Sequence, residues 1–298
     1  MKQNEWSGVF PAITTPFNND LSIDYQALQD HVSWLVDNGC RGIVALGSLG
    51  EGATLTFEEK VNIIKACKET LANRAPVVAG IAGLSTAESV TLARALANVG
   101  CDGLMVLPPY VYRGDWRETE AHVSAVISAT SLSCILYNNP IAYGTDFIPA
   151  QIKELAGRHA NLHAIKESSG DVRRVTAIRE LLGDRLAIFV GLDDAIVESI
   201  AVGAVGWVAG LVNALPRESV MLFDLATSGK FAEAQKLYEW FLPLLRLDTL
   251  PKFVQLIKLV QREVGRGSTI VRPPRLELEG EELAEMERLI LGRLSCRA

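Results

Sequence analysis

The sequence predicts an α/β fold, a (β/α)8 TIM barrel with a helical layer added at its carboxyl end. Short apolar runs alternate with amphipathic stretches eight times along the chain. Three of the apolar runs begin with the same pattern of two glycines. The chain has 298 residues, a length that fits one large barrel as well as two ordinary domains. Regular alternation of strand and helix favours the closed barrel over an open doubly wound sheet.

The repeated pattern is a helix-to-strand junction. It reads Gly, a small residue, any residue and Gly, followed by an apolar run, in "NGCRGIVALG" from Asn38, "VGCDGLMVLPP" from Val99 and "VGAVGWVAG" from Val202. The first glycine suits the left-handed residue that ends a helix, and the second relaxes packing where a strand starts. The apolar run that follows is typical of a strand covered on both faces.

Five further apolar runs complete the eight predicted strands: "GVFPAITTPF" from Gly8, "APVVAGIAG" from Ala75, "SCILYNNP" from Ser133, "LHAIKESSGD" from Leu162 and "LAIFVGLDD" from Leu186. The amphipathic stretches between them predict helices, several of which begin at a Ser, Thr or Asp cap. We expect residues 1–215 to form the barrel, with its last helix continuing to about residue 230. The helical pattern of residues 231–298 predicts an extension packed on the barrel.

Composition and charge favour a soluble, enzyme-like protein. A net charge of −6 and a pI near 5.4 provide no basic field for phosphate backbones, so we expect no nucleic-acid partner. The apolar runs are far shorter than the roughly 20 residues of a membrane-spanning helix. The first ten residues, "MKQNEWSGVF", contain no apolar stretch suited to a secretory signal. We therefore expect a cytoplasmic protein without membrane association.

The metal-binding residue types are not arranged as a metal site. Five cysteines include no C-x-x-C pair, and four of them lie within apolar patterns, as small buried side chains do. The four histidines have no H-E-x-x-H or similar spacing. Asp193 and Asp194 could bind a divalent cation, but a cap at the start of a helix is the favoured interpretation. We predict no bound metal.

Lys166 and Tyr137 are the residues with the clearest chemical potential. Active sites of such barrels lie at the carboxyl ends of the strands. Both residues end a predicted strand, and adjacent strands lie about 4.8 Å apart, so we expect the two side chains to meet. A lysine in an apolar site loses its charge more easily and can attack a carbonyl to form an imine, with a phenol as proton shuttle. From position alone, a salt bridge to Glu167 or to a neighbouring acid is an equally good interpretation.

The stretch "GSLGEG" predicts a small anion-binding turn. Its glycines do not have the spacing of a dinucleotide loop, and no G-K-[ST] follows as a phosphate loop requires. Successive backbone amides in a glycine-rich turn do form a nest of the right size for a carboxylate, here with the Ser48 hydroxyl beside it. A tight strand-to-helix turn without a ligand is the alternative.

Over nearly its whole length, the chain resembles the dihydrodipicolinate synthase and N-acetylneuraminate lyase family. The matching motifs are "GSLGE", "YNNP" and "IKESSGD", in the family's order, together with "TPF" at residues 15–17 and the helical tail. The resemblance implies covalent catalysis on 2-oxo acids or cyclic imines without metal or organic cofactor. It also implies a homotetramer, a dimer of dimers. Under this resemblance Lys166 is the residue that forms the Schiff base.

The resemblance assigns further roles position by position. It implies that Tyr137 is the general acid and base and that Ser48 relays its proton. The amides of Ser48 and Leu49 correspond to the cradle of the substrate carboxylate. Tyr110 lies where some members send a tyrosine into the neighbouring subunit's site.

The sequence also departs from the family's synthases, which have a second hydroxyl residue in place of Leu49 and an arginine in place of Ala142. That arginine binds the carboxylate of aspartate semialdehyde, so its loss argues against this substrate. The closest resemblance is to the subgroup that deaminates 1-pyrroline-4-hydroxy-2-carboxylate to 2,5-dioxopentanoate. We expect Ser168 or Tyr143 to hold the hydroxyl of this substrate and Val208 to line its site.

Several other activities remain open at this point. They are a 4-hydroxy-tetrahydrodipicolinate synthase, a dehydratase or aldolase of 2-oxo-3-deoxy sugar acids, and a non-catalytic barrel that binds a 2-oxo acid. A metal-dependent aldolase that uses Asp193 and Asp194 is a further alternative.

Overall fold

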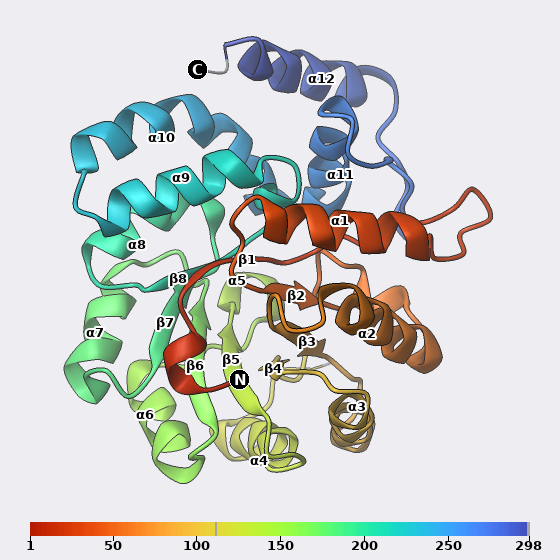
Figure 1. The fold of residues 1–298 in the computed structure, drawn as a ribbon. Helices are drawn as coiled ribbons and strands as arrows, with labels where there is room; N and C mark the ends of the chain where they lie inside the picture. The colour runs from red at the N-terminus through yellow and green to blue at the C-terminus, as the bar shows by residue number, and fades with distance from the viewer. Residues whose placement is uncertain (111, 297–298) are drawn as a thin grey trace.

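The computed structural model, which describes residues 1–110 and 112–296, contains a parallel barrel (Figure 1). The strands pair in the order β1-β8-β7-β6-β5-β4-β3-β2, and a parallel bridge between Ala12 and Val44 joins the first strand to the last in that order. Their bounds are β1 (Gly8–Pro11), β2 (Ile43–Ala45), β3 (Val77–Ile81), β4 (Gly103–Val106), β5 (Ser133–Asn138), β6 (Leu162–Glu167), β7 (Ala187–Val190) and β8 (Gly206–Ala209). The predicted (β/α)8 fold is confirmed.

Helices surround the barrel in chain order (Figure 1). They are α1 (Tyr25–Asp37), α2 (Phe57–Leu71), α3 (Thr86–Asn98), α4 (Trp116–Ile127), α6 (Pro149–Arg158), α7 (Arg173–Leu182), α8 (Ile196–Ala201) and α9 (Pro216–Thr227), with the short α5 (Pro140–Tyr143) directly after β5. Four of them begin as the sequence predicted, because the side chains of Asp24, Thr56, Ser85 and Asp115 each accept a hydrogen bond from an amide of the first turn.

Short 3₁₀ helices, labelled η, lie near several strand ends: η1 (Gln3–Glu5), η2 (Gly52–Thr54), η3 (Asp193–Ala195), η4 (Leu211–Asn213) and η5 (Arg246–Thr249). The chain beyond residue 230 forms α10 (Phe231–Leu245), α11 (Phe253–Glu263) and α12 (Gly280–Leu294). In Figure 1 these three helices form a separate group beside α9 and α1. The segment η5 joins α10 to α11 and packs against η3, at the carboxyl end of the barrel.

The repeated glycine pattern has the conformation that the sequence predicted. Gly39, Gly100 and Gly203 have φ of +96°, +83° and +110°, in the left-handed region where a side chain is strained. The second glycine of the pattern makes room for a ring. A Cβ on Gly42 would lie 2.3 Å from the ring of Phe10. The first glycine of the pattern therefore ends a helix, and the second, three residues later, leaves space for an aromatic ring inside the barrel.

An aromatic cluster fills the amino-terminal end of the barrel. The rings of Phe10 on β1 and Phe189 on β7 meet edge to face, with centroids 5.4 Å apart. The indole of Trp6 stacks on Phe10 at 5.9 Å and donates a hydrogen bond to the Ser133 hydroxyl over 2.7 Å. All three aromatic side chains are buried. Polar groups are therefore concentrated at the opposite end, where the strands terminate.

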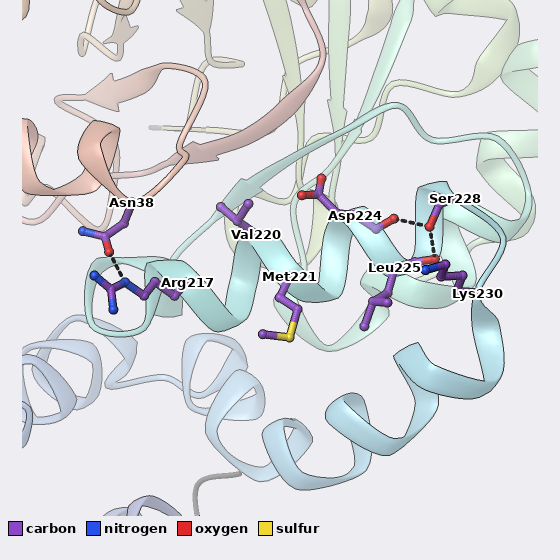
Figure 2. Close-up of a pocket in the computed structure, with 8 residues that line it drawn as sticks. All are labelled: Asn38, Arg217, Val220, Met221, Asp224, Leu225, Ser228 and Lys230. Atoms are coloured by element: carbon purple, nitrogen blue, oxygen red, sulfur yellow. Dashed lines mark hydrogen bonds between the residues drawn. The ribbon is translucent and has the colours of Figure 1, made fainter.

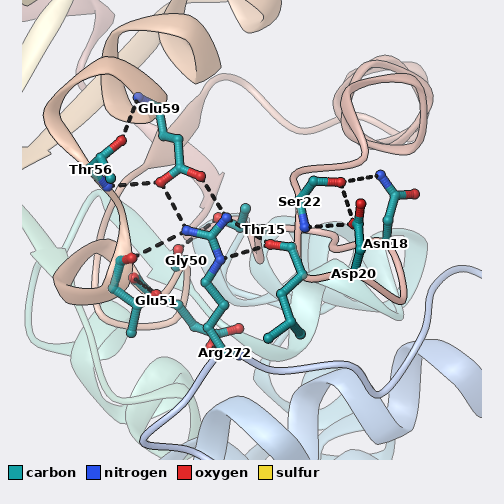
Figure 3. A network of polar contacts seen from close by, with 11 residues as sticks. Thr15, Asn18, Asp20, Ser22, Gly50, Glu51, Thr56, Glu59 and Arg272 are labelled. Carbon is teal, nitrogen blue, oxygen red and sulfur yellow. Dashed lines mark hydrogen bonds and ion pairs between the residues drawn. The ribbon is translucent and has the colours of Figure 1, made fainter.

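Buried ionic contacts fasten the carboxyl-terminal extension to the loop after β2. Lys258 on α11 donates to Glu51 over 2.7 Å, and both side chains are almost fully buried. The amide of Arg272 donates to the second Glu51 oxygen over 2.9 Å, and its guanidinium makes a two-pronged contact with Glu59 (Figure 3). The extension therefore helps to fix the conformation of the loop that carries Ser48.

Two other sequence predictions concern the character of the whole chain. Four cysteines are buried, as expected: Cys40, Cys67, Cys101 and Cys134. Among the described residues, no helix is both long enough and apolar enough to cross a membrane.

Candidate active site

Lys166 lies at the carboxyl end of β6 and points into the barrel mouth. Parallel pairing places it beside Tyr137 of β5, and its Nζ lies 4.2 Å from the centre of the Tyr137 ring. The predicted meeting of these side chains is confirmed. Lys166 forms no ion pair with any described residue. Glu167 points elsewhere, accepting from the Asn138 amide group and from the backbone of Ser169. The salt-bridge interpretation is therefore wrong.

Gly191, directly after β7, makes room for the lysine. A Cβ at this position would lie 2.3 Å from Cε of Lys166 and 2.1 Å from Oγ of Ser168. Any larger residue would displace one of these two side chains. This role of Gly191 was not predicted from the sequence, although a glycine directly after an apolar run was the available signal.

Burial controls the protonation of the lysine and the two tyrosines. Desolvation lowers the pKa of Lys166, and the negative charge of Asp248 opposes this effect. Burial raises the pKa of the Tyr137 and Tyr143 phenols. A lowered lysine pKa increases the fraction of the neutral, nucleophilic amine, and a raised phenol pKa keeps the proton on oxygen.

Tyr143 is the hydrogen-bond partner of Ser48. The two hydroxyls are in direct contact, whereas the Tyr137 hydroxyl accepts from the side-chain amide of Asn139 over 3.1 Å. The resemblance implied that Ser48 relays the proton of Tyr137; in the structure the hydroxyl in contact with Ser48 is that of Tyr143. The cause is α5, which Asn139 caps and which carries Tyr143 back over the mouth. The Tyr143 ring packs edge to face on Tyr137, 5.5 Å between centroids.

The loop after β2 offers free amides. Among the described residues, none accepts a hydrogen bond from the backbone N–H of Ser48 or Leu49. The loop is held between two left-handed residues that are not glycine, Leu46 with φ of 64° and Glu51 with φ of 54°. Such strain persists only where the surroundings enforce it, and it is frequent at ligand sites. The loop is thus preformed for a small anion such as a carboxylate.

Asp193 and Asp248 are the carboxyl groups that share electrostatic contact with Lys166. Asp193 is buried and accepts from the Trp207 indole (2.9 Å) and from the amides of Gly210 and Leu211 (3.0 and 2.7 Å). This corrects the interpretation of Asp193 as a helix cap, because its partners belong to β8 and the turn after it. Desolvation raises the pKa of Asp193 to about 6. A carboxylate surrounded by N–H donors is oriented to hydrogen bonds and not to a cation.

A cavity of about 900 Å³ opens at the carboxyl ends of the strands. Among the residues that line it are most of the predicted site: Ser48, Leu49, Tyr110, Tyr137, Tyr143, Lys166 and Val208. Ser168 is the exception, because it is buried against Gly191 and is not part of the wall. The structure adds Asp248 and Arg275, which sequence reasoning missed because both come from the extension, far along the chain.

A second, shallower hollow of about 400 Å³ lies on the outer side of α9 (Figure 2). Its best-defined polar contact is the hydrogen bond from the Arg217 guanidinium to Asn38, over 2.6 Å. Met221, half exposed, supplies much of its apolar character. It contains no nucleophile with an adjacent base, so the chemistry is concentrated in the cavity around Lys166.

Comparison with known proteins agrees with this geometry. The chain is 33% identical over 285 residues to the 4-hydroxy-tetrahydrodipicolinate synthase of Clostridium perfringens (strain SM101 / Type A), which covers 95% of this chain and 96% of that protein. The solved structure of dihydrodipicolinate synthase DapA-2 from Bacillus anthracis is 29% identical, with a TM-score of 0.92 over 96% of this chain and 98% of that one.

A third similar structure is YagE of E. coli K12, a prophage protein solved in complex with pyruvate. It is 26% identical and has a TM-score of 0.91, covering 97% of this chain and 99% of its own. A family model matches residues 5–292, almost the whole chain. These matches confirm the resemblance carried by the three motifs: the chain belongs to the dihydrodipicolinate synthetase family and is a lyase of that family.

Proposed function

We propose that the protein deaminates 1-pyrroline-4-hydroxy-2-carboxylate to 2,5-dioxopentanoate through an imine on Lys166, without metal or organic cofactor. The observation that carries the proposal is Lys166 itself, a buried lysine without an ion-pair partner among the described residues. It lies on the wall of a cavity that is also lined by three phenols and by the loop with free backbone amides. Such an amine is poised to attack a C=N or C=O carbon.

The first half of the reaction forms the lysine imine. The amides of Ser48 and Leu49 bind the substrate carboxylate, and Lys166 Nζ attacks C2 of the ring imine. The C2–N1 bond then breaks, its electron pair goes to N1, and N1 takes a proton from the Tyr137 phenol. The product is an open chain with its C2 bound to Lys166 and a free amine at C5.

The second half removes the hydroxyl and the nitrogen. The iminium acidifies C3, so that loss of a C3 proton and of the 4-hydroxyl expels water. Loss of a C5 proton and protonation of C4 convert C5 into an imine, and protonation of C3 restores the iminium at C2. Hydrolysis at C5 releases ammonia, and hydrolysis at C2 releases Lys166 and 2,5-dioxopentanoate. One water is released and two are consumed, so the overall reaction adds one water to the substrate. The hydrogen-bonded Ser48 and Tyr143 hydroxyls form the relay for these protons.

The residues around the cavity support a substrate without a second carboxylate. Ala142 lines the cavity where the family's synthases have an arginine, and Leu49 replaces their second hydroxyl residue. A charge-assisted hydrogen bond contributes about 1.5–3 kcal/mol, so its absence weakens binding of aspartate semialdehyde. The carboxyl groups of Asp194, Glu198 and Asp248 also line the cavity and would repel a second carboxylate.

The second candidate is a 4-hydroxy-tetrahydrodipicolinate synthase, the activity named for the Clostridium perfringens relative. Arg275 favours it, because this guanidinium also lines the cavity and is able to bind a carboxylate. Arg275 lies 3.9 Å from the buried carboxylate of Glu51, however, so part of its charge is already balanced. A dehydratase or aldolase of 2-oxo-3-deoxy sugar acids would use the same imine.

We also propose that the protein is a homotetramer. Tyr110, which some family members send into the neighbouring subunit's site, lines the cavity of its own chain, with its ring centroid 6.3 Å from that of Tyr143. Three large apolar side chains that follow β3, β4 and β5 support a contact surface: Leu84, Tyr112 and Ile141 are 68%, 59% and 73% exposed. Light scattering after size exclusion tests the assembly, with a monomer at micromolar concentration as the contrary result.

Competing substrates decide the proposed reaction. The pure enzyme is given 1-pyrroline-4-hydroxy-2-carboxylate, 2-oxo-3-deoxy sugar acids, or pyruvate with aspartate semialdehyde, and kcat/KM is compared. Ammonia release from the first should exceed the other turnovers by at least about 10²-fold, a ratio that contacts to one polar group can supply. Efficient condensation of pyruvate with aspartate semialdehyde would establish the second candidate. Borohydride trapping should place the adduct on Lys166, and Lys166→Arg should abolish it.

A further inference from the structure

Asp248 belongs to the extension and yet reaches the cavity around Lys166. It lies in η5, between α10 and α11, and its carboxyl group packs directly over Gly210 at the end of β8. A Cβ on Gly210 would lie 1.9 Å from Oδ1 of Asp248, so the glycine is required for this approach. The side chain lines the same cavity as Lys166.

The carboxyl group of Asp248 interacts with Lys166 through charge alone. No described residue forms a hydrogen bond or ion pair with it, in contrast to the other two aspartates nearby. Asp193 accepts from one indole and two backbone amides. Asp194 lies 3.8 Å from the Arg246 guanidinium. Because an unpaired carboxylate inside a cavity is unfavourable, Asp248 is available for a positive charge brought by a ligand.

Strand geometry puts Asp248 within reach of a substrate held by Lys166. The Lys166 stem covers Gly191 after β7, and Asp248 covers Gly210 after β8. These strands are paired neighbours, and paired strands lie about 4.8 Å apart. A five-carbon chain bound to Lys166 through C2 therefore has its far end close to Asp248.

We propose that Asp248 binds the amine at the far end of the substrate and selects 2-oxo acids with a cationic end over those with a second carboxylate. The inference rests on the proposed ring opening, which creates such an amine at C5. Burial and the negative charge of Asp193 raise the pKa of Asp248, whereas the charge of Lys166 lowers it. An arriving ammonium would act in the same direction as Lys166 and stabilise the carboxylate.

Borohydride trapping with three probes tests Asp248 independently of turnover. 1-Pyrroline-2-carboxylate opens to a 5-amino-2-oxo acid and lacks the hydroxyl that must leave. Pyruvate is too short to have a group in the position of the C5 amine, and 2-oxoglutarate has a carboxylate in that position. For Asp248→Asn, the half-saturating concentration of the amine probe should rise at least about tenfold, as expected for one lost charge-assisted contact. The half-saturating concentration of pyruvate should be the same for Asp248→Asn and the parent enzyme. That of 2-oxoglutarate should be lower for Asp248→Asn.

Control variants separate this effect from general damage. Asp248→Glu keeps the charge and should keep the preference for the amine probe. If Asp248→Asn does not fold, loss of this preference in Asp248→Glu would still contradict the proposal. Asp184→Asn removes an exposed carboxylate that is paired with Arg179 and should change nothing. Equal shifts for all three probes, or none, would overturn the role of Asp248. If the unmodified enzyme traps the amine probe but releases no ammonia from the hydroxylated substrate, the proposed function fails and the role of Asp248 stands.

Discussion

Tyr137 and Tyr143 each make one of the contacts that the sequence predicted for Tyr137 alone. Tyr137 presents its ring to the Lys166 amine, and Tyr143 holds the Ser48 hydroxyl. The motif "YNNP" was sufficient to select Tyr137, because it closes a strand next to the lysine. Tyr143 was considered only as a ligand for a substrate hydroxyl. Its contact with Ser48 depends on a four-residue helix that neither strand nor helix periodicity can reveal.

Replacing Tyr137 by Phe should lower kcat about 10²–10⁴-fold and change KM little, because general acid–base groups act in the transition state. Steady-state ammonia release measures both parameters. Tyr25→Phe, on α1 and away from the cavity, is the matched control and should leave both unchanged. An unaltered kcat for Tyr137→Phe would assign the proton transfer to Tyr143 or to water.

Replacing Gly191 by Ala should slow imine formation by roughly 10²-fold, the loss that about 1 Å of misplacement can cause. The added methyl group would overlap the Lys166 stem and the Ser168 hydroxyl. Trapping of pyruvate followed over time measures the rate. Gly292→Ala adds the same methyl group to an open position on α12 and should retain the parental rate. If Gly191→Ala traps pyruvate at the parental rate, Lys166 does not need the space at Gly191 to reach its reactive position.

At the level of elements, the sequence predicted the strands and helices that repeat along the chain and missed the short segments that do not repeat. The eight strands follow from apolar runs, and the helix caps follow from residue type. Segments such as α5 and η5 have only four residues each, too few to show a period. Their positions depend on tertiary packing. Since Tyr143 and Asp248 lie on these two segments, the contact of Tyr143 with Ser48 and the presence of Asp248 in the cavity could not be predicted from the sequence.

His31 on α1 should make folding sensitive to mild acid. It is buried, its Nε2 contacts the Asn213 side chain over 2.9 Å, and burial lowers its pKa from 6.5 to about 4. The unfolded chain therefore takes up a proton first as the pH falls. Stability from the neutral imidazole is present above pH 6.5 and is lost between pH 6.5 and 4, by up to about 3 kcal/mol.

Urea unfolding across this pH range, compared with His31→Gln, measures that loss. Glutamine does not titrate, so the free energy of unfolding of the variant should fall less between pH 7 and pH 4.5. Parallel curves for the two proteins would contradict the assignment to His31.

On the scale of the whole molecule, barrel and extension depend on each other through the pair of Glu51 and Lys258. Removing one member of a buried ion pair typically destabilises a protein by about 3–5 kcal/mol, because the other charge is left unpaired. Lys258→Met should show this loss in the free energy of unfolding. The double variant Glu51→Gln with Lys258→Met should recover much of it. Lys252→Met breaks a half-exposed pair with Glu282 on the same extension and should change stability by less than about 1 kcal/mol.

The whole-molecule architecture was predictable to the extent that it follows from alternation and motif order. The barrel, its helical extension and the family were all evident from the chain. The reach of Asp248 and Arg275 into the cavity was not, because charges more than 80 residues from Lys166 are brought there only by the way α10 and α11 dock. In the proposed function, substrate specificity is therefore encoded partly in the extension, outside the barrel that carries Lys166.

The aromatic cluster of Trp6, Phe10 and Phe189 has a kinetic consequence. It closes the end of the barrel opposite Lys166. In the proposed reaction, substrate, ammonia and the 2-oxo acid product must therefore pass through the same mouth. With a single entrance, product must leave the cavity before the next substrate can bind. The proposed product also retains the carboxylate and the 2-oxo carbon that Lys166 would attack, so it should compete with substrate for the lysine. The proposed function therefore predicts product inhibition, which is relieved when another enzyme consumes the aldehyde.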